Sequence, residues 1–152
     1  MAEELLVSKI QQGTVIDHIK AGMAPTVLRI LGIDKGFPNV VVVAMNVQSG
    51  KLGHKDIVKV ENRILSESLL RKIAIVSPDA TVNIIKEFKV AEKRTVELPK
   101  ELKGIVKCPN RNCITNSAEK VESSFVVERK SPLELRCHYC EGLVEGDKVE
   151  IL

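Results

Sequence analysis

The sequence predicts an α+β protein in two parts, and three observations lead to this prediction. Strand-like and helix-like segments follow one another in the order β-α-β-β-α-β over residues 13–90. A charged segment with a proline follows at 97–103, and beyond it stand two close pairs of cysteines with strand-like residues between them. The first pattern is typical of a ferredoxin-like sandwich with its helices on one face of the sheet. The second predicts a small antiparallel β domain that binds zinc.

The first strand and first helix are indicated by short, well-bounded patterns. Residues 13–19 form a β-branched run entered through a glycine, which is typical of a strand. Apolar residues at helical spacing over 26–31 predict a helix, which Pro25 starts and Gly32 ends. Residues 5–10 are mixed, and they suit either an arm or a short additional strand.

A hairpin is expected next. The nearly continuous valine run at 39–47 predicts a strand buried on both faces or close to it. Residues 55–61 alternate polar and apolar side chains, as a half-solvated strand does. The turn at 49–51 joins the two strands into the hairpin.

The second helix and the fourth strand complete the first part. Ser66 is the expected N-cap of the helix, and Pro78 ends it. The strand is predicted at 81–85 and continues through Phe88 and Val90. We therefore expect one domain over 1–98, a linker at 97–103, and a second domain over 103–152.

Four short strands are expected in the second domain, which has only about 50 residues. They are predicted near Ile105 and at 123–127, 133–136 and 144–152. A domain of this size has too small a core to fold by hydrophobic burial alone. A bound metal ion is therefore expected to supply much of the folding free energy.

The metal prediction depends on the only four cysteines in the chain, Cys108, Cys113, Cys137 and Cys140. Two tight turns that each present a pair of thiolates suit one tetrahedral structural Zn²⁺, and four thiolates leave no open position for catalysis. Two disulfides would need an oxidising compartment, whereas residues 1–4 show no secretory signal, so a cytoplasmic location is expected. An iron–sulfur cluster fits the ligand type, but the spacing favours zinc.

Composition and charge restrict the partners. No apolar run approaches the roughly 20 residues of a membrane span. Residues 1–98 carry 14 basic and 11 acidic side chains, whereas residues 99–152 carry nine of each, so the zinc-loaded second domain would be net negative. A zinc domain that grips nucleic acid usually has a basic face. The charges therefore favour a protein partner for the second domain and a small anion for the first.

The first domain offers a candidate anion site on its predicted sheet. Lys55 and Lys59 are four residues apart in a strand, so they share a face, and Lys93 follows the last strand. Asp17 and Asn83 can accept from a base amine or a ribose hydroxyl. From the residues alone, an ordinary solvated sheet face is the slightly better interpretation.

An enzyme and a nucleic-acid-binding protein are the two other classes that the sequence could suggest. No P-loop, dinucleotide fingerprint or nucleophile–base set is present, so an enzyme is the weakest interpretation. A nucleic-acid-binding protein would combine a ferredoxin-like domain with a zinc ribbon, but it would need basic and aromatic residues on the sheet. Aromatic residues make up 3% of the chain. We therefore expect no nucleic acid among the partners.

Several motifs, taken together and in this order, resemble the regulatory chain of aspartate carbamoyltransferase. The resemblance runs from about Leu5 to the end of the chain, and the Lys-, Glu- and Val-rich composition is similar to that of archaeal or thermophilic members. The segments that carry it are GTVIDHI at 13–19, SGKLGHKD at 49–56, KVEN at 59–62, PDATVN at 78–83, CPNRNCI at 108–114 and CHYCE at 137–141.

The resemblance implies a non-catalytic subunit that controls pyrimidine biosynthesis. In the family, the N-terminal domain binds nucleotides, CTP usually as inhibitor and ATP often as activator, and the zinc domain docks onto the catalytic chains. Regulatory chains also pair as dimers through their N-terminal domains.

The matching motifs imply roles for individual residues. Lys59 and Lys93 match triphosphate contacts, Lys55 a contact near the ribose, and Asp17 a contact to the base amine. The other implied nucleotide contacts are Ile10, Val15, His18, Asn83, Ile85, Phe88 and Val90. Phe88 stands where the family has a tyrosine, and so lacks a hydroxyl. Asn110, Asn112, Tyr139 and Glu141 match residues at the interface with the catalytic chain.

Overall fold

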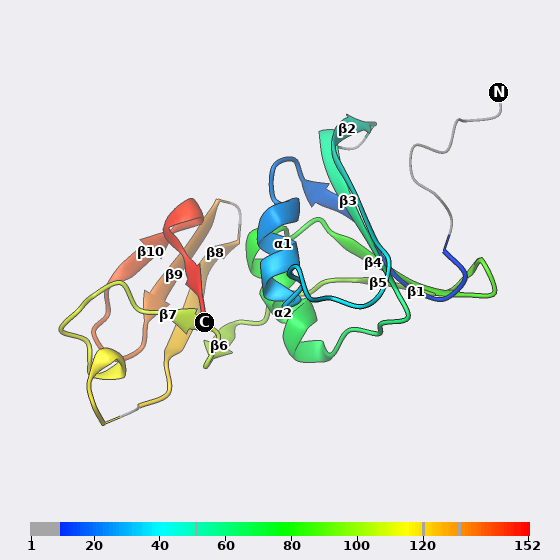
Figure 1. Cartoon of the computed structure of the whole chain (residues 1–152). Helices are drawn as coiled ribbons and strands as arrows, with labels where there is room; N and C mark the ends of the chain where they lie inside the picture. Colours follow the sequence, from blue (N-terminus) through cyan, green and yellow to red (C-terminus); the bar gives the residue numbers. More distant parts are fainter. Residues whose placement is uncertain (1–9, 51, 120, 131) are drawn as a thin grey trace. The chain divides into compact units, whose positions relative to one another are not determined.

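The computed structural model describes residues 10–50, 52–119, 121–130 and 132–152 (Figure 1). The predicted arm lies outside the described residues except for Ile10. The chain divides between Glu97 and Leu98 into two compact units. None of the helices in these ranges has the length and apolar composition that crossing a membrane requires.

The first unit is a five-stranded antiparallel sheet with two helices. The sheet order is β2-β3-β1-β4-β5, and its first four strands have the ferredoxin-like arrangement that the sequence predicts. Both helices lie on the same side of the sheet (Figure 1). The elements are β1 (Gly13–Lys20), α1 (Ala24–Ile30), β2 (Val41–Ser49), β3 (Gly53–Glu61), α2 (Glu67–Val76), β4 (Thr81–Lys86) and β5 (Lys89–Thr95).

The helices begin and end for the local reasons that the sequence indicates. The Ser66 hydroxyl accepts a hydrogen bond from the Leu69 N–H, so Ser66 is the N-cap of α2. The helix ends at Val76, two residues before Pro78. Helix α1 carries Pro25 in its first turn, and Gly32 follows it with φ of +71°. Both predicted helices are therefore confirmed.

The predicted fourth strand is confirmed at 81–86, but its continuation through Phe88 and Val90 is wrong. The chain reverses after β4 at Glu87 and Phe88, which both have positive φ, and returns as β5. Two consecutive positive φ values are typical of a tight hairpin turn, which usually contains Asn or Gly. Glu-Phe carries no such signal, so the sequence pattern runs straight through the turn.

The prediction that the valine-rich strand is buried on both faces is also wrong. In the part of the chain that the structure describes, strand β2 lies at the edge of the sheet and pairs only with β3, and none of its side chains is fully buried. Val40, just before it, is 56% exposed and Met45 is 47% exposed. The sheet therefore has an apolar edge among the described residues.

Asp56 is a buried carboxylate that joins three segments of the first unit. Its side chain is fully buried on β3, on the same face as Val58 and Val60. It accepts hydrogen bonds from the backbone N–H groups of Gly22 and Ala24 at 2.9 Å and of Asn46 at 2.8 Å. These bonds connect β3 to the turn before α1 and to the bulge in β2. Buried backbone donors need such partners.

Gly13 occupies a position that no other residue fits. Its φ is +143°, and a Cβ there would lie 2.2 Å from the Val60 carbonyl oxygen. We expect Gly13→Ala to lower the free energy of unfolding by at least about 2 kcal/mol, through this clash and the strained backbone. Gly50→Ala is the control, because its Cβ would meet open space. Urea unfolding of both variants measures the difference, and equal midpoints would contradict the assignment.

The second unit is a small β domain. It holds a four-stranded sheet of order β10-β9-β8-β6 and a two-stranded ladder of β11 and β7, and Phe125, Leu102 and Leu135 are fully buried in it. Its elements are β6 (Glu101–Lys103), β7 (Val106–Lys107), the 3₁₀ turn η1 (Ile114–Asn116), β8 (Ser124–Lys130), β9 (Leu133–Cys137), β10 (Leu143–Glu145), the 3₁₀ turn η2 (Gly146–Lys148) and β11 (Glu150–Ile151).

Two expectations for this unit need correction. Residues 101–103 of the predicted linker form β6, because they pair with β8 at the edge of the sheet. The predicted last strand over 144–152 is interrupted, since η2 separates β10 from β11 and the two strands belong to different ladders.

Candidate functional sites

The four cysteines meet in one cluster between the two knuckles of the second unit. Their sulfurs all lie within 4.8 Å of one another. The Cys108 and Cys140 sulfurs are 3.6 Å apart, and those of Cys113 and Cys137 are 3.7 Å apart. Both separations are far longer than a disulfide bond of about 2.05 Å. A tetrahedral zinc site with Zn–S bonds of about 2.3 Å has sulfur–sulfur edges of about 3.8 Å, so these two separations are compatible with a zinc ion.

The environment treats the four thiols unequally. Burial raises the pKa of Cys108 and of Cys137. Burial acts in the same direction on Cys113, but hydrogen bonds from the Thr115 hydroxyl and backbone lower its pKa to about 7. At Cys140, the Gly142 backbone and the Asn110 side chain likewise outweigh burial and lower the pKa. Hydrogen bonds to a sulfur favour its charged form, which is the form that binds metal.

The first knuckle is held by a set of short hydrogen bonds. The Asn110 side-chain oxygen accepts from the Asn112 N–H at 3.0 Å, and the Cys113 N–H donates to the Asn110 carbonyl. The Asn116 amide donates to the carbonyls of Cys108 and Asn110, at 2.9 and 2.7 Å. These hydrogen bonds shape the loop, and both of its cysteines are buried.

The second knuckle turns at Glu141, where φ is +62°. The Cys137 N–H donates to the Gly142 carbonyl, and the Glu141 N–H donates to the Cys137 carbonyl. The His138 and Tyr139 rings stack edge to face with centroids 5.1 Å apart. All four predicted partner-interface residues, Asn110, Asn112, Tyr139 and Glu141, are exposed around the cysteine cluster.

On the sheet of the first unit, predicted nucleotide contacts form a row across four strands. Val15 of β1 stands opposite Lys59 of β3 on one side and opposite Asn83 of β4 on the other, and Asn83 stands opposite Lys93 of β5. Directly opposed residues share a face of the sheet. The two lysines are three strand spacings apart, about 14 Å. This row lies on the face opposite the one that Val58 and Val60 bury.

Asp17 lies beside this row and holds two further predicted contacts. Its carboxylate is 2.9 Å from the Lys55 ammonium and accepts a hydrogen bond from the His18 N–H at 2.6 Å. His18 has φ of +55° where the register of β1 shifts, and its Nδ1 lies 3.0 Å from the Thr81 hydroxyl. Asp17, Lys55 and His18 therefore form one connected polar group.

The Asn83 side chain has an unusual feature. Its Oδ1 is buried and has no hydrogen-bond partner among the described residues. A buried acceptor left unpaired costs about 1–3 kcal/mol. Such a group is an exception in folded proteins, and it lies on the same face of the sheet as the two lysines.

The remaining predicted contacts lie near one end of the row. Ile85 stands opposite Val90 across the β4–β5 pair, and Phe88 lies at the tip of this hairpin. Ile85 is buried, whereas Phe88 and Val90 are each 57% exposed. The Phe88 N–H donates to the Gln11 carbonyl, which places the hairpin tip against the segment that holds the buried Ile10.

Three residues that organise these sites were not predicted. Thr115 and Asn116 follow the first cysteine pair directly, so hydroxyl and amide donors within three residues of a knuckle cysteine are the signal that could have indicated them. Asp56 stands two residues before Val58 and four before Val60, and this alternation places it on the buried face of β3.

Two family models match the chain, and together they cover most of it. The model described as aspartate carbamoyltransferase regulatory chain, allosteric domain, matches residues 5–97, and the model described as its metal binding domain matches residues 100–150. The matches define a non-catalytic chain with one allosteric and one metal-binding domain.

Curated relatives agree along nearly the whole length. Regulatory chains of aspartate carbamoyltransferase from Thermococcus gammatolerans and Thermococcus kodakarensis are each 52% identical to it, over 96% of both chains for the first and over 98% of this chain and 97% of the relative for the second. The chain from Methanothermobacter thermautotrophicus is also 52% identical, over 97% of this chain and 94% of the relative. The chain belongs to the family of aspartate carbamoyltransferase regulatory chains, as the sequence motifs predict.

Proposed function

We propose that this chain gives nucleotide control to the catalytic chain of aspartate carbamoyltransferase, and thereby to pyrimidine biosynthesis. The domain of residues 1–98 binds the nucleoside triphosphates CTP and ATP. The domain of residues 103–152 holds one structural zinc ion and docks onto the catalytic chain. The observation that carries the nucleotide proposal is the row Lys59–Val15–Asn83–Lys93.

The row suits a nucleoside triphosphate in three ways. Lysines at its two ends supply positive charge for the phosphates. Asn83 supplies a buried acceptor that has no partner among the described residues, and it could accept from an amine or hydroxyl of the ligand. Val90 supplies apolar surface, since it is 57% exposed. On an ordinary solvated sheet face, an acceptor such as the Asn83 oxygen would be bonded to water rather than buried without a partner. The buried Asn83 oxygen therefore favours a binding site over a solvated face.

Docking is supported by the chemistry around the zinc site. The thiolates and their hydrogen bonds hold Asn110, Asn112, Tyr139 and Glu141 at the surface of a rigid pair of knuckles. Balanced charge and exposed amide and aromatic groups suit a protein surface better than a polyanion. The zinc then acts structurally, by fixing the docking loops.

Pairing of two regulatory chains is supported by the edge strand β2. Val43 and Met45 are exposed on it, and its outer backbone groups have no neighbouring strand among the described residues. Long apolar edges invite pairing with another strand. A second copy of this chain is the occupant that we propose.

Control requires that a nucleotide bind the low- and high-activity states of the assembly with different affinity. A coupling free energy of about 1–3 kcal/mol is sufficient for heterotropic control.

Calorimetric titration of the full chain with CTP and with ATP tests the nucleotide site. We expect Lys59→Ala and Lys93→Ala to weaken binding roughly 10- to 100-fold each, because each removes a charge-assisted contact of about 1.5–3 kcal/mol. Lys35→Ala, in the exposed loop after α1, is the matched control and should bind as the unmodified chain does. Absence of binding by the unmodified chain, or equal affinity in all three variants, would refute the site.

A further inference from the structure

Thr115 makes two contacts to a single cysteine sulfur. Its hydroxyl donates to the Cys113 Sγ at 3.2 Å, and its backbone N–H is also hydrogen-bonded to that sulfur. Cys113 is only 3% exposed, so these donors replace the water that would otherwise solvate the thiolate. Thr115 is half-buried in η1, where the turn fixes its position.

In the described residues, two of the four sulfurs accept hydrogen bonds from side chains other than cysteine. Among the described residues, Thr115 donates to Cys113 and the Asn110 side chain to Cys140, whereas Cys108 and Cys137 receive backbone donors and contacts from neighbouring thiols. Four thiolates around a divalent ion carry two net negative charges. Donors that touch the sulfurs stabilise this charge and orient the ligands.

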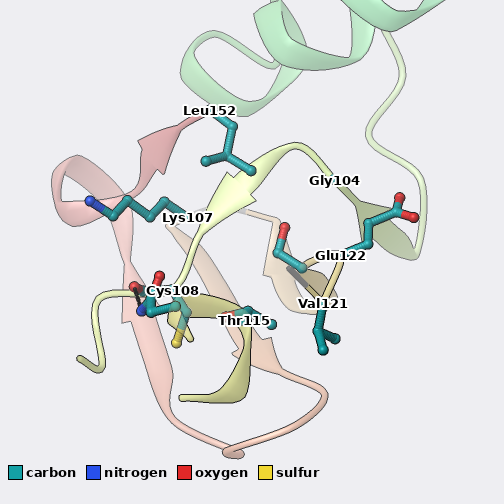
Figure 2. A pocket seen from close by; sticks show the side chains of 9 residues that line it. Gly104, Lys107, Cys108, Thr115, Val121, Glu122 and Leu152 are labelled. Atoms are coloured by element: carbon teal, nitrogen blue, oxygen red, sulfur yellow. Dashed lines mark hydrogen bonds between the residues drawn. The ribbon is translucent and has the colours of Figure 1, made fainter. Parts of the chain in front are cut away.

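Thr115 also lies where the cluster meets a hollow of the surface. Thr115 and Cys108 both line a pocket of about 300 Å³, together with Lys107 and Val121 (Figure 2). Cys113 does not line this pocket. A thiol-seeking reagent that enters this pocket therefore meets Cys108 and Thr115.

We propose that Thr115 is a positioning residue of the metal site, whose hydroxyl stabilises the Cys113 thiolate in its metal-bound form and slows release of the metal. A sulfur lone pair engaged in an O–H···S bond is a weaker nucleophile, so an electrophile captures it more slowly. The hydroxyl also holds the sulfur at its corner of the cage. This inference rests on the proposal that the cluster holds zinc.

The test compares zinc release from the full chain and from two variants of this residue. Each protein is loaded with Zn²⁺ and mixed with excess mercurial, and the freed metal is followed with an indicator dye. We expect Thr115→Val to release zinc roughly tenfold faster and Thr115→Ser to stay within about twofold of the unmodified chain. Valine keeps the branched shape of threonine and replaces the hydroxyl by a methyl group.

A variant of a neighbouring residue separates the loss of the hydrogen bond to the thiolate from a loss of loop stability. The Ser117 hydroxyl donates to the Ile114 carbonyl at 2.7 Å in the same turn, and among the described residues it makes no hydrogen bond to a sulfur. Ser117→Ala should therefore release zinc at nearly the unmodified rate. In Co²⁺-loaded protein, the sulfur-to-cobalt charge-transfer band should move to lower energy in Thr115→Val and stay in place in Ser117→Ala.

The outcomes distinguish a failure of the Thr115 role from a failure of the proposal that the cysteine cluster holds zinc. An unmodified chain that takes up neither Zn²⁺ nor Co²⁺ would overturn the zinc proposal, and this inference with it. A loaded chain whose Thr115→Val variant keeps the original band and release rate would overturn the role of Thr115 alone. Equal acceleration in Ser117→Ala, without a band shift in either variant, would do the same.

Discussion

Replacing Cys137 by serine is expected to unfold the metal-binding domain while the N-terminal domain stays folded. Cys137 ends β9, is fully buried and contributes one corner of the cysteine cage. A structural zinc site supplies about 10–16 kcal/mol of apparent binding free energy, which is also folding free energy. Loss of one of four ligands removes most of it.

The small core of this domain cannot compensate. Its fully buried large side chains are few, chiefly Phe125, Leu102, Leu135 and Val106, in a unit that begins at Leu98. Domains of this size usually need a metal or disulfides. The N-terminal domain has its own sheet and helices, so its unfolding transition should remain.

Calorimetric melting of the full chain measures this effect. The unmodified chain with zinc should show two transitions, and Cys137→Ser should lose the one that belongs to the metal-binding domain. Metal-stripped unmodified chain should behave like the variant and recover when zinc is returned, whereas Cys137→Ser should not recover. Two intact transitions in the stripped chain would contradict a metal-dependent fold.

The second large effect is expected at Asp56. Replacing it by alanine removes the acceptor of three backbone N–H groups, those of Gly22, Ala24 and Asn46. A buried donor left unpaired costs about 1–3 kcal/mol, which would give about 3–9 kcal/mol for three such donors. Only the Ala24 bond is fully buried, and the Gly22 and Asn46 bonds are part-buried, so we expect a loss in the lower part of this range, roughly 3–6 kcal/mol. Total stabilities of domains are about 5–15 kcal/mol, so such a loss brings the N-terminal domain close to unfolding.

Two further variants make the Asp56 prediction specific. Asp56→Asn keeps one acceptor oxygen and places a donor where the other stood, so it should lie between alanine and the unmodified chain. Asp34→Ala removes a single exposed bond to the Gly36 N–H and should change stability by less than about 1 kcal/mol. Denaturant unfolding of the N-terminal transition gives the values. Equal losses of unfolding free energy for Asp34→Ala and Asp56→Ala would contradict a large contribution of the buried carboxylate to stability.

Local signals in the sequence predicted most of the fold. Ser66 and Pro78 bound α2 because capping and the missing proline N–H act within one turn. The exposure of β2 could not be predicted, because its valines have the same pattern at the edge and in the middle of a sheet. The turn at Glu87 and Phe88 was missed since neither residue favours the positive φ that it adopts.

The sites divide in a similar way. Cysteine spacing indicated the cage because the ligand geometry of zinc is strict. The lysines, Asp17 and Asn83 were indicated by the sequence as a candidate anion site, and the other predicted nucleotide contacts came from the resemblance. Register explains why distant positions such as Lys59 and Lys93 belong to one row. The ion pair of Asp17 with Lys55 and the unpaired Asn83 oxygen depend on tertiary contacts, which a linear pattern does not contain.

The most direct test of this account is the activity of the catalytic chain of aspartate carbamoyltransferase from the same organism, measured with this chain present and with CTP or ATP added. Size-exclusion chromatography with light scattering, run in parallel, gives the mass of the assembly and of the free regulatory chain. We predict that zinc-loaded chain binds the catalytic chain and makes its rate respond to at least one nucleotide, and that Lys59→Ala binds equally but loses the response. Metal-stripped chain should not bind the catalytic chain. An assembly whose rate neither nucleotide changes, or one that forms equally well without metal, would contradict the account.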